Sequence, residues 1–213
     1  MSVLIIGNGS SFNKYSNEEV FNSIELIICA DGGLSKAEIL GLVPDIIIGD
    51  FDSVNYSILK KYEDMNVEII KYPAEKDYTD MELAIDLAVN KGYKDMIILG
   101  ATGTRLDHTM ANMLLLEKYY KQGIKIKIID NNNIIQIISD DTKLTLQYKK
   151  NYFISIVPIT EEINDLTLKG FKYPLNKVNV KRGSTLCISN EINVKVSEVT
   201  LRSGTAFLIV AND

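Results

Sequence analysis

Short apolar runs recur along the first part of the chain and alternate with amphipathic stretches. The runs lie at residues 3–6, 26–30, 46–48, 67–70, 96–99 and 124–129, and each is rich in β-branched residues. Because these runs are continuous rather than alternating, they predict strands buried on both faces of a parallel sheet. Helical spacing predicts helices between them, at residues 34–40, 55–64, 80–90 and 107–121. The alternation of strands and helices predicts a three-layer α/β/α domain with a mostly parallel sheet.

Two of these helices have recognisable apolar positions. In the helix at residues 80–90, one stripe holds Met81, Ala84, Ile85 and Ala88, with Glu82 and Asp86 facing away. The helix at residues 107–121 carries Met110, Met113 and Leu114 as its apolar positions and ends in a basic turn. Both helices are therefore expected to cover the parallel sheet.

After Asp130 the pattern changes to short strands separated by turn residues. The strand-like segments are residues 136–139, 144–148, 152–158, 166–168, 184–189, 193–199 and 205–210, and several alternate polar with apolar positions. This spacing, without helical periodicity, predicts a β-sandwich. The polar run at residues 130–133 places the boundary between an α/β catalytic domain at residues 1–130 and a β-sandwich domain at residues 131–213.

Composition narrows the functional classes. The chain has 213 residues, a net charge of -5 and 46% hydrophobic residues, which is ordinary for a globular protein. A pI near 5.1 argues against a nucleic-acid partner, which would require a basic face. No apolar run approaches the ~18 residues of a membrane span, so no membrane partner is expected. The absence of a basic leader and the placement of Cys29 and Cys187 in apolar runs predict a cytoplasmic protein with free, buried thiols.

Acidic residues gather where the predicted strands end. Ligands of parallel α/β domains bind beyond the carboxyl ends of the strands. Asp31 follows the second strand, where a helix-capping role is the alternative interpretation. Asp50 and Asp52 follow the third strand and project to the same side of an extended chain. Two such carboxylates suit Mg²⁺ together with substrate phosphates. The alternative interpretation of the same residues is an Asp-rich turn with solvated side chains.

Further candidates follow the fourth and fifth strands. Thr79 and Glu82 have capping-box spacing, which places Asp77 and Asp80 near the start of a helix. The Gly/Thr-containing loop at residues 100–104 precedes another helix and offers backbone N–H groups to an anion. Arg105 can donate two hydrogen bonds to a phosphate. Two residues and one loop complete the list. His108, which suits either a structural or a catalytic role, shares a helix face with Asn112, and the Gly7–Ser11 loop is a weaker phosphate contact.

Four motifs in this order resemble thiamine pyrophosphokinase (thiamine diphosphokinase) of the bacterial type. They are Asp31-Gly32-Gly33, Gly49-Asp50-Phe51-Asp52-Ser53, Lys76-Asp77-Tyr78-Thr79-Asp80-Met81-Glu82, and Arg105-Leu106-Asp107-His108 with Asn112. Residues 182–191, which end in Ser189, Asn190 and Glu191, resemble the second-domain motif of that family. The resemblance covers nearly the whole chain.

The resemblance implies a reaction and a set of site residues. The reaction is Mg²⁺-dependent transfer of a pyrophosphoryl group from ATP to the hydroxyl of thiamine, giving AMP and thiamine diphosphate. The partners implied are thiamine, ATP and a second copy of the chain, in a homodimer with active sites at the subunit interface. The implied residues are Asp50, Asp52 and Asp80 for metal; Asp31, Gly32, Thr79, Arg105, His108 and Asn112 for nucleotide; Asp77, Asp107 and Arg105 for catalysis; and Ser189 and Asn190 for thiamine.

Two features depart from the family pattern. The loop before the Arg105 motif reads Gly100-Ala101-Thr102-Gly103, where the family has paired glycines. Some members stack a tryptophan against thiamine, whereas this chain has none. Either a Tyr or Phe replaces it, with Tyr173 and Phe207 as the candidates, or the stacking contact is absent.

Two other functions compete with this interpretation. A metal-dependent glycosyltransferase would explain the Asp50 and Asp52 pair but not the clusters around Asp80 and Arg105. A nucleotide or thiamine sensor without turnover would share the same residues. Formation of AMP only when thiamine is present separates the kinase from both.

Overall fold

The computed structural model describes residues 2–10, 12, 21, 23–51 and 56–212. The chain divides into two compact units, residues 1–131 and 132–213, which are described separately. None of the helices in the described ranges is long and apolar enough to cross a bilayer.

The first unit is built on a sheet of parallel strands in the order β6-β5-β1-β2-β3-β4. Their bounds are β1 (Ser2–Ile6), β2 (Ile24–Ala30), β3 (Ile46–Gly49), β4 (Glu68–Lys71), β5 (Asp95–Leu99) and β6 (Lys125–Ile129). The central strands are buried on both faces, as in Val3, Leu4, Ile5 and Ile6 of β1. The continuous apolar runs are therefore explained by helices on both sides of the sheet.

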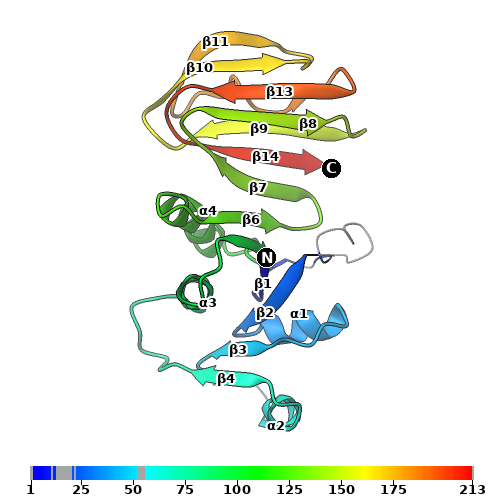
Figure 1. Cartoon of the computed structure of the whole chain (residues 1–213), viewed down its shortest axis with the longest axis vertical. Coiled ribbons are helices and arrows are strands. Elements are labelled where there is room, and N and C mark those ends of the chain that lie inside the picture. Colours follow the sequence, from blue (N-terminus) through cyan, green and yellow to red (C-terminus); the bar gives the residue numbers. More distant parts are fainter. Residues whose placement is uncertain (1, 11, 13–20, 22, 52–55, 213) are drawn as a thin grey trace. The chain divides into compact units, whose positions relative to one another are not determined.

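Two pairs of helices cover this sheet (Figure 1). Their bounds are α1 (Gly33–Ile39), α2 (Tyr56–Asp64), α3 (Asp80–Asn90) and α4 (Leu106–Tyr120). An ion pair of 2.9 Å joins Lys61 of α2 to Glu38 of α1. Another of 2.5 Å joins Lys118 of α4 to Glu82 of α3. Figure 1 shows the two pairs on opposite faces, so the predicted three-layer α/β/α arrangement is confirmed.

The buried face agrees with the prediction for α3 but not for α4. In α3 the predicted stripe of Met81, Ala84, Ile85 and Ala88 is the buried face. In α4 the prediction was wrong, because Met110 is 68% exposed and Leu114 is 50% exposed. The buried face of α4 consists of Asn112, Leu116 and Tyr119. The helix has thus turned a polar amide inward and left apolar side chains at the surface.

The second unit contains two antiparallel sheets, with strand orders β12-β9-β14-β7 and β11-β10-β13-β8. Side chains such as Ile156, Leu166, Val199 and Leu208 form its buried core. The β-sandwich prediction is confirmed. The bounds are β7 (Asn133–Ile138), β8 (Thr142–Gln147), β9 (Tyr152–Pro158), β10 (Glu162–Lys169), β11 (Leu175–Lys181), β12 (Asn190–Glu191), β13 (Val196–Leu201) and β14 (Ala206–Asn212).

Two details of the second unit differ from expectation. Residues 184–189 form a loop rather than a strand, because only Cys187 of this segment is buried while Leu186 and Ile188 are exposed. The strand β11 was not among the predicted strands. Cys187 and Cys29 are free and buried, as expected. Burial raises the pKa of these thiols to about 11 and about 12, respectively, so both stay protonated at neutral pH.

Candidate active site

A cavity of about 550 Å³ lies in the first unit, where β1, β2, β3 and β5 end. Each of these strands contributes the residues that immediately follow it, and α3 and α4 add their first turns. The sequence-predicted residues that line it are Asp31, Asp50, Thr79, Asp80, Arg105, His108 and Asn112. Gly32, Asp77 and Asp107 are sequence neighbours of lining residues. The fold therefore assembles residues that are far apart in the chain.

Glycines allow two of the loops to approach each other closely. The Gly9 N–H donates to the Gly100 carbonyl over 2.8 Å, and the Ser10 N–H donates to the Thr102 carbonyl over 2.6 Å. A Cβ on Gly9 would overlap both of these carbonyl oxygens. Only glycine fits at this position. The Gly7–Gly9 segment lines the cavity.

The loop at residues 100–105 is held from several directions. The buried Asn112 donates from Nδ2 to the Ala101 carbonyl over 2.7 Å. Thr109 accepts a hydrogen bond from the Gly103 N–H at 3.1 Å. Thr102 donates to the Asp130 carboxylate over 2.7 Å. These bonds fix the loop before any ligand arrives, and the Asn112 side chain serves partly as its support.

The carboxylates come from different elements. Asp31 and Asp50 follow the adjacent strands β2 and β3, and Asp80 is the first residue of α3. Asp31 has a left-handed backbone with φ of 46°, and its N–H donates to the Ile48 carbonyl over 2.7 Å. Aspartate adopts this conformation more readily than most residues other than glycine. Asp52 lies outside the described residues.

Asp80 is held by two features of its surroundings. Thr79 caps α3 and accepts a hydrogen bond from the Glu82 N–H at 3.2 Å, which confirms the predicted helix start. The Lys76 ammonium lies 2.7 Å from the Asp80 carboxylate. Both side chains of this ion pair are largely covered, and both line the cavity.

The donor set suits Mg²⁺, although it is not gathered into a preformed cage. Among the described residues, no three His, Cys, Asp or Glu side chains are close enough together to hold a metal ion. Mg²⁺ typically takes one or two protein carboxylates and completes its shell with water and substrate phosphates. Asp50 and Asp80, which line one cavity, fit this requirement.

Arg105 and Asp107 form a forked ion pair at the start of α4. Nε and Nη2 of Arg105 donate to the two carboxylate oxygens of Asp107 over 3.2 and 2.6 Å. The bonds from Arg105, together with the His108 backbone N–H, lower the pKa of Asp107 to about 2. Asp107 is therefore a poor proton acceptor while this pair persists.

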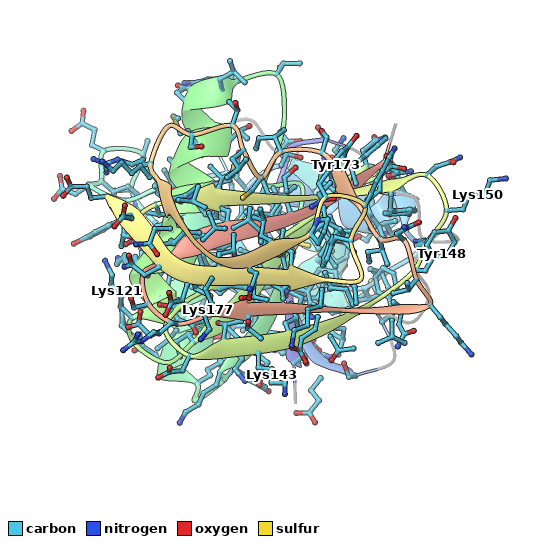
Figure 2. The ribbon with its side chains drawn as sticks, turned by 90° about the horizontal axis from the view of Figure 1, so that it is seen from above. Lys121, Lys143, Tyr148, Lys150, Tyr173 and Lys177 are labelled. Carbon is cyan, nitrogen blue, oxygen red and sulfur yellow. The ribbon has the colours of Figure 1, made fainter. Side chains whose placement is uncertain are left out.

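The second unit contains the remaining predicted residues. Asn190 is buried, and its Oδ1 accepts a hydrogen bond from the Tyr173 N–H over 3.1 Å while its Nδ2 donates to the Tyr173 carbonyl over 2.8 Å. Asn190 thus fixes the loop that carries Tyr173, which is labelled in Figure 2. Tyr173 is 60% exposed. Ser189 is exposed with a left-handed φ of 56°. Phe207 is buried, so Tyr173 is the accessible aromatic of the two candidates.

Comparison with known proteins identifies the family. Residues 17–128 match the model of the thiamin pyrophosphokinase catalytic domain. Residues 141–206 match the model of the thiamin pyrophosphokinase vitamin B1 binding domain. The chain belongs to the thiamin pyrophosphokinase family. The resemblance inferred from the four motifs is thereby confirmed.

Individual thiamin pyrophosphokinases are similar over most or all of the chain. Thiamine pyrophosphokinase of Bacillus subtilis (strain 168) is 39% identical over 173 residues, which are 81% of each chain. The crystal structure of thiamine pyrophosphokinase from Bacillus subtilis aligns with a TM-score of 0.89 and 32% identity over 100% of both chains. That of the Geobacillus thermodenitrificans thiamin pyrophosphokinase aligns with a TM-score of 0.84 and 32% identity over 100% of this chain and 98% of the other.

Several cavity residues of this thiamin pyrophosphokinase family member were not assigned from sequence. Lys76, Tyr78 and Thr109 line the cavity, and Gly7–Gly9 form part of its wall rather than a marginal contact. Lys76 lies in the loop before the N-cap of α3, so the four-residue spacing rule for helix surfaces does not predict its ion pair with Asp80. The role of Thr109 depends on the shape of the loop at residues 100–105 and left no local signal either.

Proposed function

We propose that this protein is a Mg²⁺-dependent thiamine diphosphokinase that uses ATP as co-substrate. The match of both family models, in order along one chain, supports this proposal most strongly. In the reaction, the thiamine hydroxyl oxygen bonds to the β-phosphorus of ATP, and the bond from that phosphorus to the α–β bridging oxygen breaks. AMP leaves with the bridging oxygen, the hydroxyl proton passes to a base or to water, and thiamine diphosphate remains.

Residues 1–130 bind ATP and Mg²⁺ in this proposal. Asp50, Asp52 and Asp80 would hold the metal ion, which when bound offsets charge on the phosphates. Their location beyond parallel strands supports the assignment of Asp50 and Asp80. Asp52→Asn should lower turnover steeply and leave the fold intact, since the change removes one charge and conserves volume. Near-normal turnover at saturating Mg²⁺ would contradict the metal assignment.

The nucleotide lies along the loops of the first unit. Arg105 donates to the phosphates with its planar guanidinium, and the backbone of the loop at residues 100–105 adds N–H groups. Asp31, Gly32, Thr79, His108 and Asn112 complete the nucleotide site. Asn112 contributes to the site by holding the loop at residues 100–105 in position, through its hydrogen bond to the Ala101 carbonyl.

In this proposal Asp77, rather than Asp107, is the base that accepts the proton of the thiamine hydroxyl. A carboxyl whose pKa is about 2 accepts a proton poorly at neutral pH, so Asp107 serves to orient Arg105. Asp77 is exposed beside the cavity-lining residues Lys76 and Tyr78. Asp77→Asn should therefore lower turnover at saturating substrates more than Asp107→Asn does.

Residues 131–213 bind thiamine in this proposal, with Ser189 and Asn190 on the aminopyrimidine side. Exposed Tyr173, which Asn190 positions, is suited to stack against an aromatic ring of thiamine. Tyr173→Ala should raise the KM for thiamine and leave the KM for ATP unchanged, whereas Tyr173→Phe should restore thiamine binding.

The protein acts as a cytoplasmic homodimer with active sites at the subunit interface. Leu106, Met110 and Leu114 are exposed and spaced four residues apart, so they form one apolar face of α4. Exposed apolar faces of this kind mark association surfaces. Met110→Lys should shift the molecular mass by light scattering from dimer to monomer. The exposed Ile39 of α1 is the matched control, and Ile39→Lys should remain dimeric.

Product analysis tests the proposed reaction directly. Purified protein is incubated with Mg²⁺ and ATP, with and without thiamine, and AMP is quantified. AMP that forms only in the presence of thiamine supports the kinase and contradicts the glycosyltransferase. Thiamine binding by calorimetry without AMP release would instead identify a sensor.

A further inference from the structure

Lys76 occupies an unusual position for a lysine. It lies in the loop before α3, lines the cavity, and is only 14% exposed, whereas most lysines are solvated. Its ammonium contacts the Asp80 carboxylate at 2.7 Å and lies 5.9 Å from the centroid of the Tyr72 ring. Asp80 is itself 23% exposed. A charge pair so placed is part of the cavity wall rather than of the solvated surface.

The charged side chains described around the cavity include more carboxylates than lysine and arginine cations, and Lys76 is one of these cations. Among the described lining residues, the acids are Asp31, Asp50 and Asp80, and the lysine and arginine cations are Lys76 and Arg105. Carboxylates that share one cavity repel each other and would also repel the phosphates of ATP. The side chain of Arg105 is 71% exposed and paired with Asp107. Lys76 is therefore the covered cation that compensates this acidic wall.

The two partners of the pair differ in mobility. Asp80 is fixed by the backbone of α3, which Thr79 caps. Lys76 carries its ammonium on a flexible four-carbon stem with three rotatable N–H donors. A change of partner therefore requires rotation of the lysine side chain and no movement of the helix.

We propose that Lys76 is a counter-ion switch that neutralises Asp80 in the nucleotide-free protein and transfers its ammonium to an ATP phosphate when the metal nucleotide binds. This inference rests on the proposed function, because it takes Asp80 as a metal-binding carboxylate. Lys76 thereby acts as a specificity device: a divalent cation alone must compete with the ammonium for Asp80, whereas a metal nucleotide brings the phosphate that accepts it.

The switch predicts opposite effects of a single substitution. Lys76→Met removes the charge and retains a similar side-chain length. The Asp80 carboxylate then loses its competitor, so binding of a divalent cation without nucleotide should become about tenfold tighter, which corresponds to about 1.4 kcal/mol. The phosphate loses a charged donor, so nucleotide binding should become about tenfold to a hundredfold weaker. A lysine that only stabilises the loop would weaken both.

Two binding measurements test this without thiamine and without turnover. Mn²⁺ binding in the absence of nucleotide is measured by electron paramagnetic resonance of the free ion. Binding of the α,β-methylene analogue of ATP with Mg²⁺ is measured by calorimetry, since this analogue cannot break at the α–β bridge. The variants are Lys76→Met and Lys76→Arg, with Lys71→Met as control, because Lys71 is exposed at the end of β4 and does not line the cavity.

The expected result is a tighter Mn²⁺ site and a weaker nucleotide site in Lys76→Met, with Lys76→Arg and Lys71→Met close to the parent protein. In an Asp80→Asn background, Lys76→Met should no longer tighten Mn²⁺ binding. Unchanged nucleotide affinity, or parallel weakening of both ligands in a folded variant, would overturn the switch. Absence of turnover with thiamine would refute the proposed function while leaving these two affinities measurable, so the two failures are distinguishable.

Discussion

Replacing Asn112 with alanine separates support of the nucleotide loop from direct contact with the nucleotide. Asn112 is buried, and its Nδ2 donates to the buried Ala101 carbonyl over 2.7 Å. Loss of the donor leaves that carbonyl without this partner, which costs about 1–3 kcal/mol. Alanine returns roughly 0.5 kcal/mol through its higher helix propensity. The expected net loss of stability is about 0.5–2.5 kcal/mol, or a Tm lowered by roughly 1–10 °C.

Differential scanning calorimetry of the ligand-free protein measures this effect, and calorimetric titration with the ATP analogue measures the consequence for binding. Both stability and nucleotide affinity should fall, because the loop at residues 100–105 loses its buried support. Asn90→Ala at the exposed end of α3 brings the same kind of gain in helix propensity and should lower neither. Unchanged Tm together with weaker nucleotide binding would refute the loop-support role and make Asn112 a direct ligand.

Three more predictions concern the loops, the ion pair and the thiols. Gly9→Ala should destabilise the protein by about 1–3 kcal/mol in thermal unfolding, because its Cβ would overlap two carbonyl oxygens. Gly103→Ala should be neutral, because a Cβ on Gly103 would make only ordinary van der Waals contacts. The pKa of Asp107 is lowered from its ordinary value of 3.8 to about 2. The stabilisation from its pair with Arg105 is therefore fully present above pH 3.8 and is lost as the pH falls through about 2. An NMR titration midpoint near 3.8 would contradict this pairing. Cys29 and Cys187 should resist alkylation at pH ~8 in the native state and react after unfolding in urea, because burial raises both pKa values.

The parallel part of the fold was predictable because its signals are local. Continuous apolar runs located the strands, and the predicted helix at residues 80–90 has the observed bounds of α3. The facing of α4 was not predictable in this way. Its apolar residues at 110 and 114 suggested a buried stripe, yet the buried face includes the amide of Asn112, which the Ala101 carbonyl satisfies. A tertiary hydrogen bond between a helix and a loop leaves no periodic signal.

The carboxylates of the site could be predicted from the sequence. The residues that hold loops and other side chains in place were harder to predict. Asp31 and Asp50 could be placed because carboxyl ends of neighbouring parallel strands meet at one edge. The role of Lys76 was missed because a lysine among acidic residues is also typical of a solvated surface loop. Asn190 is still a proposed thiamine contact, but the sequence did not reveal that its side chain also holds the backbone of Tyr173. Such support depends on two segments that are distant in the chain.

Tracing the phosphorus atoms of ATP tests the central claim most directly. Parallel reactions with thiamine and Mg²⁺ receive ATP labelled at the α or the γ phosphorus, and the products are separated. The proposed pyrophosphoryl transfer places the γ label in thiamine diphosphate and the α label in AMP, in equal amounts and only when thiamine is present. Release of ADP with a singly phosphorylated thiamine, or AMP formed without thiamine, would contradict the account.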